Sequence, residues 1–148
     1  MSILSDAFLA TDAELAATQF EGSGGPIAFF PTLQGKGIDP LKLLLLEAIV
    51  MEQAIPNPDI LDQRVVRGKD ESSEQWIYQF PDTMVARLAE LTAAEISRYG
   101  TMWAPTEEWR GPKEIPPIAV ITHYLQQLCQ LAMHAQTEER HIYMWIAL

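Results

Sequence analysis

The chain has 148 residues, of which 48% are hydrophobic, and its formal net charge is −10. This length suits one domain with a substantial core, and the apolar content excludes a chain that is disordered throughout. The acidic charge, with ten scattered Lys and Arg residues, argues against binding to nucleic acid or to anionic membranes, because the phosphates of both would be repelled.

The amino-terminal part predicts a strand followed by a helix. Ile3–Ala10 reads as a short strand. Thr11 and Glu14 have the spacing of a capping box, which predicts a helix that continues to about Phe20. The segment 22–26, which is rich in glycine and ends in proline, then ends this helix. It is not expected to be a phosphate-binding loop, because the lysine of that motif is absent.

A central helix follows a short apolar run. Ile27–Phe30 lies between prolines and predicts an edge strand. Asp39 and Pro40 together are typical of a helix start, with Asp as the cap and Pro in the first turn. The helix is apolar around most of its circumference and ends before Pro56, so we expect it to be central in the fold.

The middle of the chain predicts a hairpin and two helices. Residues 63–67 and 75–80 have the composition of paired strands, joined by a polar loop. A helix is expected to begin at Pro81 and Asp82. Thr92 with Glu95 forms a second capping box, which predicts a break and a new helix to about Trp103.

The carboxyl-terminal part predicts the longest regular elements. Residues 104–117 contain four prolines and are expected to be irregular, whereas Ile118 to about Gln136 has a clear helical stripe. The final residues, Arg140–Leu148, predict a strand that is apolar on both faces and therefore internal to a sheet, with the first strand as its neighbour. We therefore predict a single α+β domain over residues 1–148, with a small mixed or mainly antiparallel sheet and helices packed on it.

The sequence contains no recognisable catalytic or cofactor motif, and we expect neither a cofactor nor a metal site. His123 and His134 are eleven residues apart, or about 16 Å along a helix, too far for one ion. His134 and Glu138 are four residues apart, but a third ligand such as His141 would have to fold back. Ordinary surface histidines are the preferred interpretation, and no catalytic residue is assigned.

Two other features of the sequence, a single cysteine and a basic cluster, could carry chemistry but have simpler explanations. Cys129, the single cysteine, lies between apolar helix positions and is expected to pack in the core as a small hydrophobic residue. Arg64, Arg67 and Lys69 form a basic cluster suited to an anion, although the acidic residues that follow are expected to neutralise it. With one cysteine, no signal-peptide pattern and no long apolar run, the expected location is the cytoplasm.

The best candidate for a partner surface is the tryptophan-bearing segment. Trp103, Trp109 and Arg110 lie in or beside a proline-rich stretch with charges of both signs. Trp and Arg dominate the energetically important positions of protein interfaces. The alternative is that both rings cover the edge of the core and hold the segment down.

Three short patches resemble a scattered group of small bacterial proteins with no assigned function. They are Phe8–Thr11 after the first strand, Tyr78–Asp82 before a helix, and Tyr143–Trp145 in the final strand. The patches are structural in type. The resemblance therefore implies a shared architecture and carries no activity or catalytic residue with it.

Three functions remain open at this stage. The leading hypothesis is a non-catalytic module that binds or regulates a protein partner, expected to be basic, for which immunity proteins are an example by analogy. The second is a small enzyme, with a site assembled from distant residues such as Asp6, His141 and Tyr143 if the terminal strands pair. The third is a homo-oligomeric structural component, and the oligomeric state is left open.

Overall fold

The computed structural model describes residues 3–20, 24–68, 74–104 and 118–147. Its elements, in chain order, are β1 (Leu4–Ala10), α1 (Asp12–Ala16), the 3-10 turn η1 (Pro26–Ala28), β2 (Thr32–Leu33), α2 (Pro40–Met51), the 3-10 turn η2 (Pro58–Ile60), α3 (Leu61–Arg64), β3 (Val65–Arg67), β4 (Gln75–Gln79), α4 (Asp82–Glu90), α5 (Ala93–Trp103), α6 (Ile118–Glu138) and β5 (His141–Ala147). The predicted α+β class is confirmed.

The strands form one sheet in the order β2-β1-β5-β4-β3, and every pairing is antiparallel. Strand β5 pairs with β1 along its whole length, from Leu4 opposite Ala147 to Ala10 opposite His141. Its other edge pairs with β4. The predicted internal position of the last strand is therefore confirmed, as is its pairing with the first.

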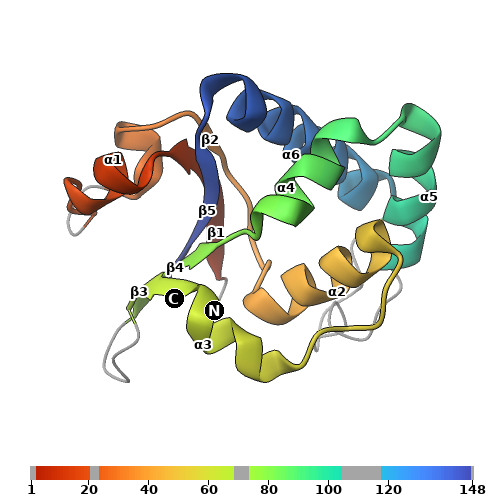
Figure 1. The fold of residues 1–148 in the computed structure, drawn as a ribbon, viewed down its shortest axis with the longest axis horizontal. Coiled ribbons are helices and arrows are strands. Elements are labelled where there is room, and N and C mark those ends of the chain that lie inside the picture. The colour runs from red at the N-terminus through yellow and green to blue at the C-terminus, as the bar shows by residue number, and fades with distance from the viewer. Residues whose placement is uncertain (1–2, 21–23, 69–73, 105–117, 148) are drawn as a thin grey trace.

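The two faces of the sheet are covered unequally. Helices α2, α4, α5 and α6 lie on one side, and α1 and η1 lie on the other (Figure 1). Residues directly opposite in an antiparallel pair project to the same face, so Ala7 and Met144 face the large helical core, while Phe8 and Tyr143 face the smaller cluster under α1. Phe8 stacks on the Tyr143 ring at 5.7 Å.

The prediction of an edge strand at Ile27–Phe30 is wrong. The run begins as a 3-10 turn, because Gly25 has φ of 100° and Pro26 fixes the next residue, after which the amides of Phe29 and Phe30 both donate to the Pro26 carbonyl. The edge strand is instead β2. The α1 helix also ends at Ala16, before its predicted end.

Helices α1, α2, α4 and α5 begin where the sequence predicts, whereas α3 was not predicted and occupies residues 63 and 64, where a strand was expected to begin. Thr11 and Thr92 each form a complete capping box, with Glu14 and Glu95 respectively. Asp39 caps α2 by accepting from the Lys42 amide at 2.9 Å. These caps satisfy backbone donors that the first helical turn leaves without intrahelical partners.

Close contact between α5 and α6 depends on Gly100. A Cβ at this position would lie 2.4 Å from the Thr122 Oγ1 and 3.1 Å from the Thr122 Cα. The glycine, which weakens a helix in isolation, is therefore required for the two backbones to approach.

Cys129 of α6 is 4% exposed and packs in the large core as predicted.

An ion pair is buried where α2 meets the sheet. The Arg64 Nη1 lies 2.6 Å from Glu47 Oε1, and Nη2 lies 3.2 Å from Oε2. Nη1 also donates to the Tyr78 hydroxyl at 2.9 Å. Glu47, the one acidic residue within the apolar run of α2, is thus matched by a guanidinium from α3, and the pair fixes α2 against β4.

Candidate functional site

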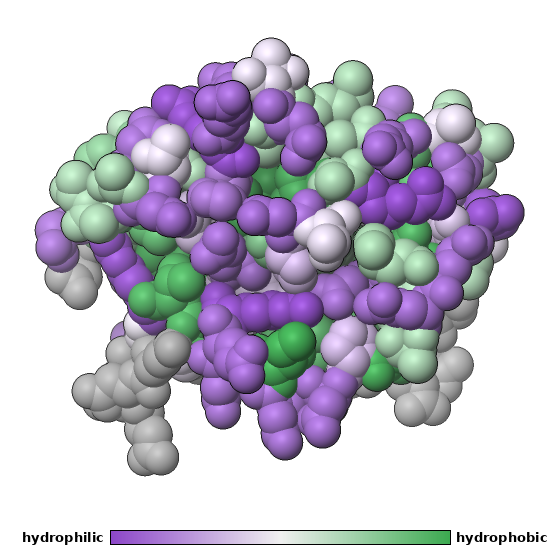
Figure 2. Space-filling view, viewed as in Figure 1, coloured by the Kyte–Doolittle hydropathy of each residue, from purple (hydrophilic) through white to green (hydrophobic). Residues whose placement is uncertain are grey.

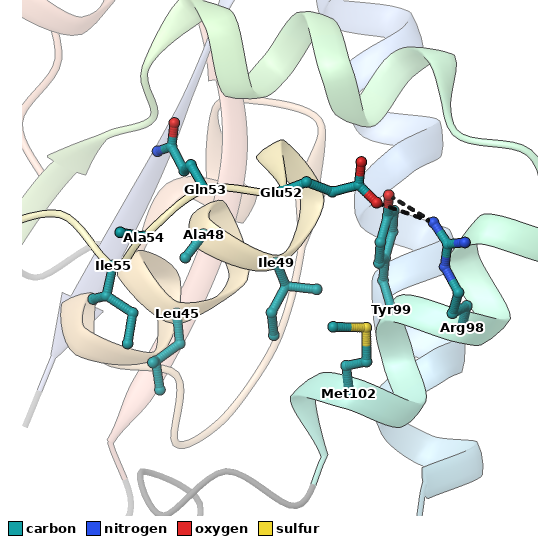
Figure 3. A pocket seen from close by; sticks show the side chains of 10 residues that line it. All are labelled: Leu45, Ala48, Ile49, Glu52, Gln53, Ala54, Ile55, Arg98, Tyr99 and Met102. Carbon is teal, nitrogen blue, oxygen red and sulfur yellow. Dashed lines mark hydrogen bonds and ion pairs between the residues drawn. The ribbon is translucent and has the colours of Figure 1, made fainter.

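An apolar groove lies between α2 and α5 (Figure 3). Its volume is about 590 Å³, which is within the range of pockets that accept several side chains or a small ligand. Its walls come from one face of α2, the segment that follows α2, and one face of α5. The lining residues are Leu45, Ala48, Ile49, Glu52, Gln53, Ala54, Ile55, Arg98, Tyr99 and Met102.

The groove is lined by apolar side chains that the core leaves partly exposed. The α2 helix buries Leu43, Leu46 and Val50 on its inner side, and because it is apolar around its circumference the opposite side turns Leu45 and Ile49 toward the groove. Ile55 is 58% exposed and Met102 is 49% exposed. Large exposed apolar side chains that gather in a concavity are typical of interaction surfaces.

Charged groups close one end of this groove. The Arg98 Nη2 lies 3.4 Å from Glu52 Oε1, across the groove from α5 to the end of α2. Arg98 also donates to the Tyr99 hydroxyl at 3.1 Å and lies 4.9 Å from the centre of that ring. The Arg98 and Glu52 side chains are 58% and 66% exposed, so this pair contributes little stability.

The floor beneath these charges is held by Arg87 of α4. Its Nε donates to the Val50 carbonyl at 2.9 Å, and its Nη2 donates to Glu95 at 2.8 Å and to the Tyr99 hydroxyl at 3.1 Å. The hydrogen bond to Glu95 is the largest cause of the raised pKa of Arg87. A single guanidinium therefore ties α2, α4 and α5 together and makes the groove a preformed feature.

A second site lies on the other side of the sheet, where β5 begins. The His141 Nδ1 is 3.0 Å from Asp82 Oδ1, and its Nε2 is 3.6 Å from Asp12 Oδ1. The Tyr143 hydroxyl donates to the same Asp12 carboxylate. Burial raises the pKa of Tyr143, and the Asp12 hydrogen bond and charge add to that effect, so the phenol is a stable donor to Asp12.

The pocket beside this cluster has a volume of about 340 Å³. It is lined by Asp12, Leu15, Ala16, Val66, Arg67, Gln79 and Tyr143. The Arg67 guanidinium is occupied by the carbonyl oxygens of Thr18, at 2.6 Å, and Leu15. The pocket therefore offers a carboxylate, a phenol and an amide beside apolar walls, with no uncommitted cation among its described lining residues.

The residues proposed from sequence for this region only partly converge. His141 and Tyr143 are two residues apart in β5 and therefore share one face of the strand, with ring centres 6.1 Å apart. Asp6 lies opposite Trp145, farther along the sheet, and accepts a 3.4 Å hydrogen bond from the Gly35 amide. Its place beside the histidine is taken by Asp12 and Asp82, which sequence analysis did not propose as site residues.

The structure describes only one of the three residues that were predicted to form the partner surface. Trp103 is fully buried, and its Nε1 donates to the Lys42 carbonyl at 3.1 Å, so its ring belongs to the core and not to the surface. Trp109 and Arg110 lie outside the described residues. The helical spacing from Tyr99 to Trp103 was the available signal, because residues four apart share the buried face of α5.

The basic cluster of the hairpin does not form an open anion site among the residues described. Arg64 is engaged by Glu47 and Arg67 by two carbonyl oxygens, and Lys69 lies outside them. His123 and His134 are exposed on α6. Within the described ranges, no three His, Cys, Asp or Glu side chains are arranged to hold a metal ion.

The lengths and composition of the helices bear on whether any of them could span a membrane. In the parts of the chain that the structure describes, no helix combines the length and the apolarity needed to cross a lipid bilayer.

Comparison with known proteins gives a likeness in fold. No family model matches the sequence, and the curated proteins contain no match to it. The chain is similar to the crystal structure of YfbM from Escherichia coli, a protein of unknown function, with a TM-score of 0.51 and 11% sequence identity over 97% of this chain and 99% of that one. The chain thus resembles an uncharacterised bacterial protein, as the sequence patches implied, and at this identity the likeness concerns the fold alone.

Proposed function

We propose that the protein is a non-catalytic module that binds a basic protein partner. The observation that carries this proposal is the distribution of charge. Every arginine in the described ranges is engaged within the chain: Arg64 by Glu47, Arg67 by backbone carbonyls, Arg87 by Glu95, Arg98 by Glu52, and Arg140 by Glu14 and Glu138. These bonds leave the acidic excess turned outward.

Several exposed carboxylates complete this distribution. Within the described part of the chain, no ion pair or side-chain hydrogen bond engages the carboxylates of Asp59, Asp62, Glu90 and Glu139, and all four residues are exposed. Figure 2 shows hydrophilic residues over much of one face, with apolar residues in separate patches between them. An acidic surface of this kind accelerates association with a basic partner and favours it over acidic ones.

The finer proposal is a cytoplasmic protein that neutralises or regulates its partner, as an immunity protein does. Trp109 and Arg110 are proposed to belong to the partner surface, because their residue types dominate interface energetics. A complete internal set of hydrogen bonds and ion pairs among the described arginines supports binding over catalysis, since few cations are left to stabilise a developing negative charge.

The test is capture of a basic protein from lysate of the source cells, followed by quantitative binding with the purified partner. We expect affinity to fall by at least about tenfold between about 50 mM and about 500 mM salt, because screening weakens charge steering and exposed pairs. Asp59→Asn with Asp62→Asn should weaken binding, whereas Lys36→Gln, which removes a cation, should not. An affinity that does not change with salt, or Trp109→Ala and Arg110→Ala variants that bind like the wild type, would contradict the corresponding part of the proposal.

The His141 cluster supports a second candidate, a small enzyme that uses general acid–base chemistry. A histidine oriented by one carboxylate, with a second carboxylate and a phenol nearby, is an arrangement suited to proton transfer. In this candidate the cluster activates a water molecule as the attacking group.

This candidate is tested with chromogenic carboxylic and phosphoric esters, by comparing His141→Asn with His134→Asn. Both histidines lie at or near the surface, but His134 is on α6 and outside the cluster. An enzyme should lose at least about 100-fold in turnover in His141→Asn and keep its rate in His134→Asn. Equal rates in the two variants would remove the candidate.

A further inference from the structure

We infer that the groove between α2 and α5 receives the apolar side of a cationic amphipathic helix of the partner. The inference rests on the proposed function, since it names the site and the structural class of the basic partner. It depends on three features of the groove: the elements that line it, the apolar side chains it exposes, and the charges at its rim.

The lining elements select a helix. All the lining residues come from α2, the segment after it, and α5, so the groove has no strand edge to which an extended peptide would add. A channel between two helices accepts the side-chain ridge of a third helix, which is the usual way in which amphipathic helices enter apolar grooves. The volume of about 590 Å³ leaves room for several anchoring side chains.

The apolar side chains supply the contact. Leu41, Leu45 and Ile49 follow one another at four-residue intervals on α2, and Leu41 is still 42% exposed. Met102 of α5 faces Ile49 across the groove, and Ile55 lies beside Leu45 at the other end; each of these two flanking residues is about half exposed. Methionine is well suited to this role because its flexible thioether adapts to the shape of an incoming side chain.

The rim supplies the sign of the charge. Glu52 stands at one end of the groove with only an exposed partner, Arg98. Asp59 is four residues beyond Ile55 and so lies within about 14 Å of it, even with the chain fully extended. Asp62 follows in α3. The lining itself carries one acid, Glu52, and one base, Arg98. The preference for a cationic helix therefore comes from the acidic residues beyond the lining and from the net charge of −10. A second copy of this chain is disfavoured as the occupant, because each copy has a net charge of −10.

A synthetic peptide of about 18 residues tests the inference. It carries leucine on one helical face and lysine on the other, with a fluorescent label for anisotropy measurements. Two further peptides serve as controls: one with the same composition in shuffled order, and one with glutamate in place of lysine. The protein variants are Met102→Glu in the groove and Met133→Glu as a matched control on α6, where Met133 is 54% exposed and does not line the groove.

The two variants are expected to move affinity in opposite directions. Each adds one negative charge at an exposed methionine, which by charge alone favours a cationic peptide. Met102→Glu also places a carboxylate in the apolar contact, so we expect binding at least about tenfold weaker, whereas Met133→Glu should bind as tightly as the wild type or more tightly. Circular dichroism of both variants confirms that they fold.

The outcomes separate this inference from the proposal on which it rests. If the lysine–leucine peptide binds in a salt-dependent manner but Met102→Glu and Met133→Glu have equal affinities, the groove is not the site, while the basic-partner proposal stands. If the shuffled peptide binds as well as the amphipathic one, the occupant is not a helix. If none of the lysine peptides binds while a captured basic partner still binds in a salt-dependent manner, the helix inference fails and the proposed function stands; if neither binds, both fail.

Discussion

Replacement of Arg64 by methionine should expose how strongly the fold depends on the buried pair with Glu47. The two side chains are 13% and 7% exposed, so the substitution leaves a carboxylate with little access to water. Breaking a buried ion pair by removing one partner costs about 3–5 kcal/mol. The Tyr78 hydroxyl loses its donor as well, which adds about 1 kcal/mol.

Partial access of water to the Arg64 side chain reduces this sum, and we expect the free energy of unfolding to fall by about 3 kcal/mol. The assay is urea unfolding followed by tryptophan fluorescence and far-UV circular dichroism. The double variant Glu47→Leu with Arg64→Met should recover to within about 1 kcal/mol of the wild type, since a well-packed apolar replacement of a buried pair is often neutral. A loss below about 1 kcal/mol in Arg64→Met, or losses that simply add in the double variant, would refute this account.

Three further outcomes follow from individual sites. Burial raises the pKa of Asp6, so its contribution to stability is complete below the unfolded-state pKa and is lost as pH rises through the folded-state pKa; Asp6→Asn should therefore unfold at higher urea than the wild type near neutral pH, and the two should converge in acid. Burial also raises the pKa of Cys129 to about 12, so its thiol should react with Ellman's reagent only at the rate of unfolding, and rapid labelling of the native protein would contradict this. Gly100→Ala should destabilise the protein by about 1–2 kcal/mol despite the higher helix propensity of alanine, because the added methyl meets Thr122; calorimetry that shows equal or greater stability would show that the contact relaxes.

Local sequence signals were enough to predict most helices and strands, whereas the candidate sites depend on contacts between residues that are remote in sequence. Asp39 before Pro40, and an apolar run that surrounds the helix, were enough to predict a central α2. The edge strand was misplaced because Ile27–Phe30 has strand composition, while its backbone is set by Gly25 and Pro26 before it. Composition describes side chains, but the turn is determined by two residues outside the run.

The candidate sites were harder to predict for the same reason. The groove exists because α2 and α5, which are remote in sequence, lie beside each other. Neither helix contains a sequence motif that predicts this contact. The two-residue spacing of His141 and Tyr143 in one strand places them on the same face, yet their carboxylate partners come from the starts of α1 and α4. Those positions look like ordinary first-turn acids in a sequence, since Asp favours the amino end of any helix.

The order of strands in the sheet has a consequence for biosynthesis. Strand β1 is made early and β5 late, yet the two are adjacent along their entire length. Until β5 has been synthesised, one edge of β1 has no strand to pair with, and the apolar side chains on both faces of β1 are not yet covered. Contacts of such long sequence separation slow folding, and an unpaired apolar strand invites aggregation. The nascent chain is therefore expected to be most prone to aggregation before β5 has been synthesised.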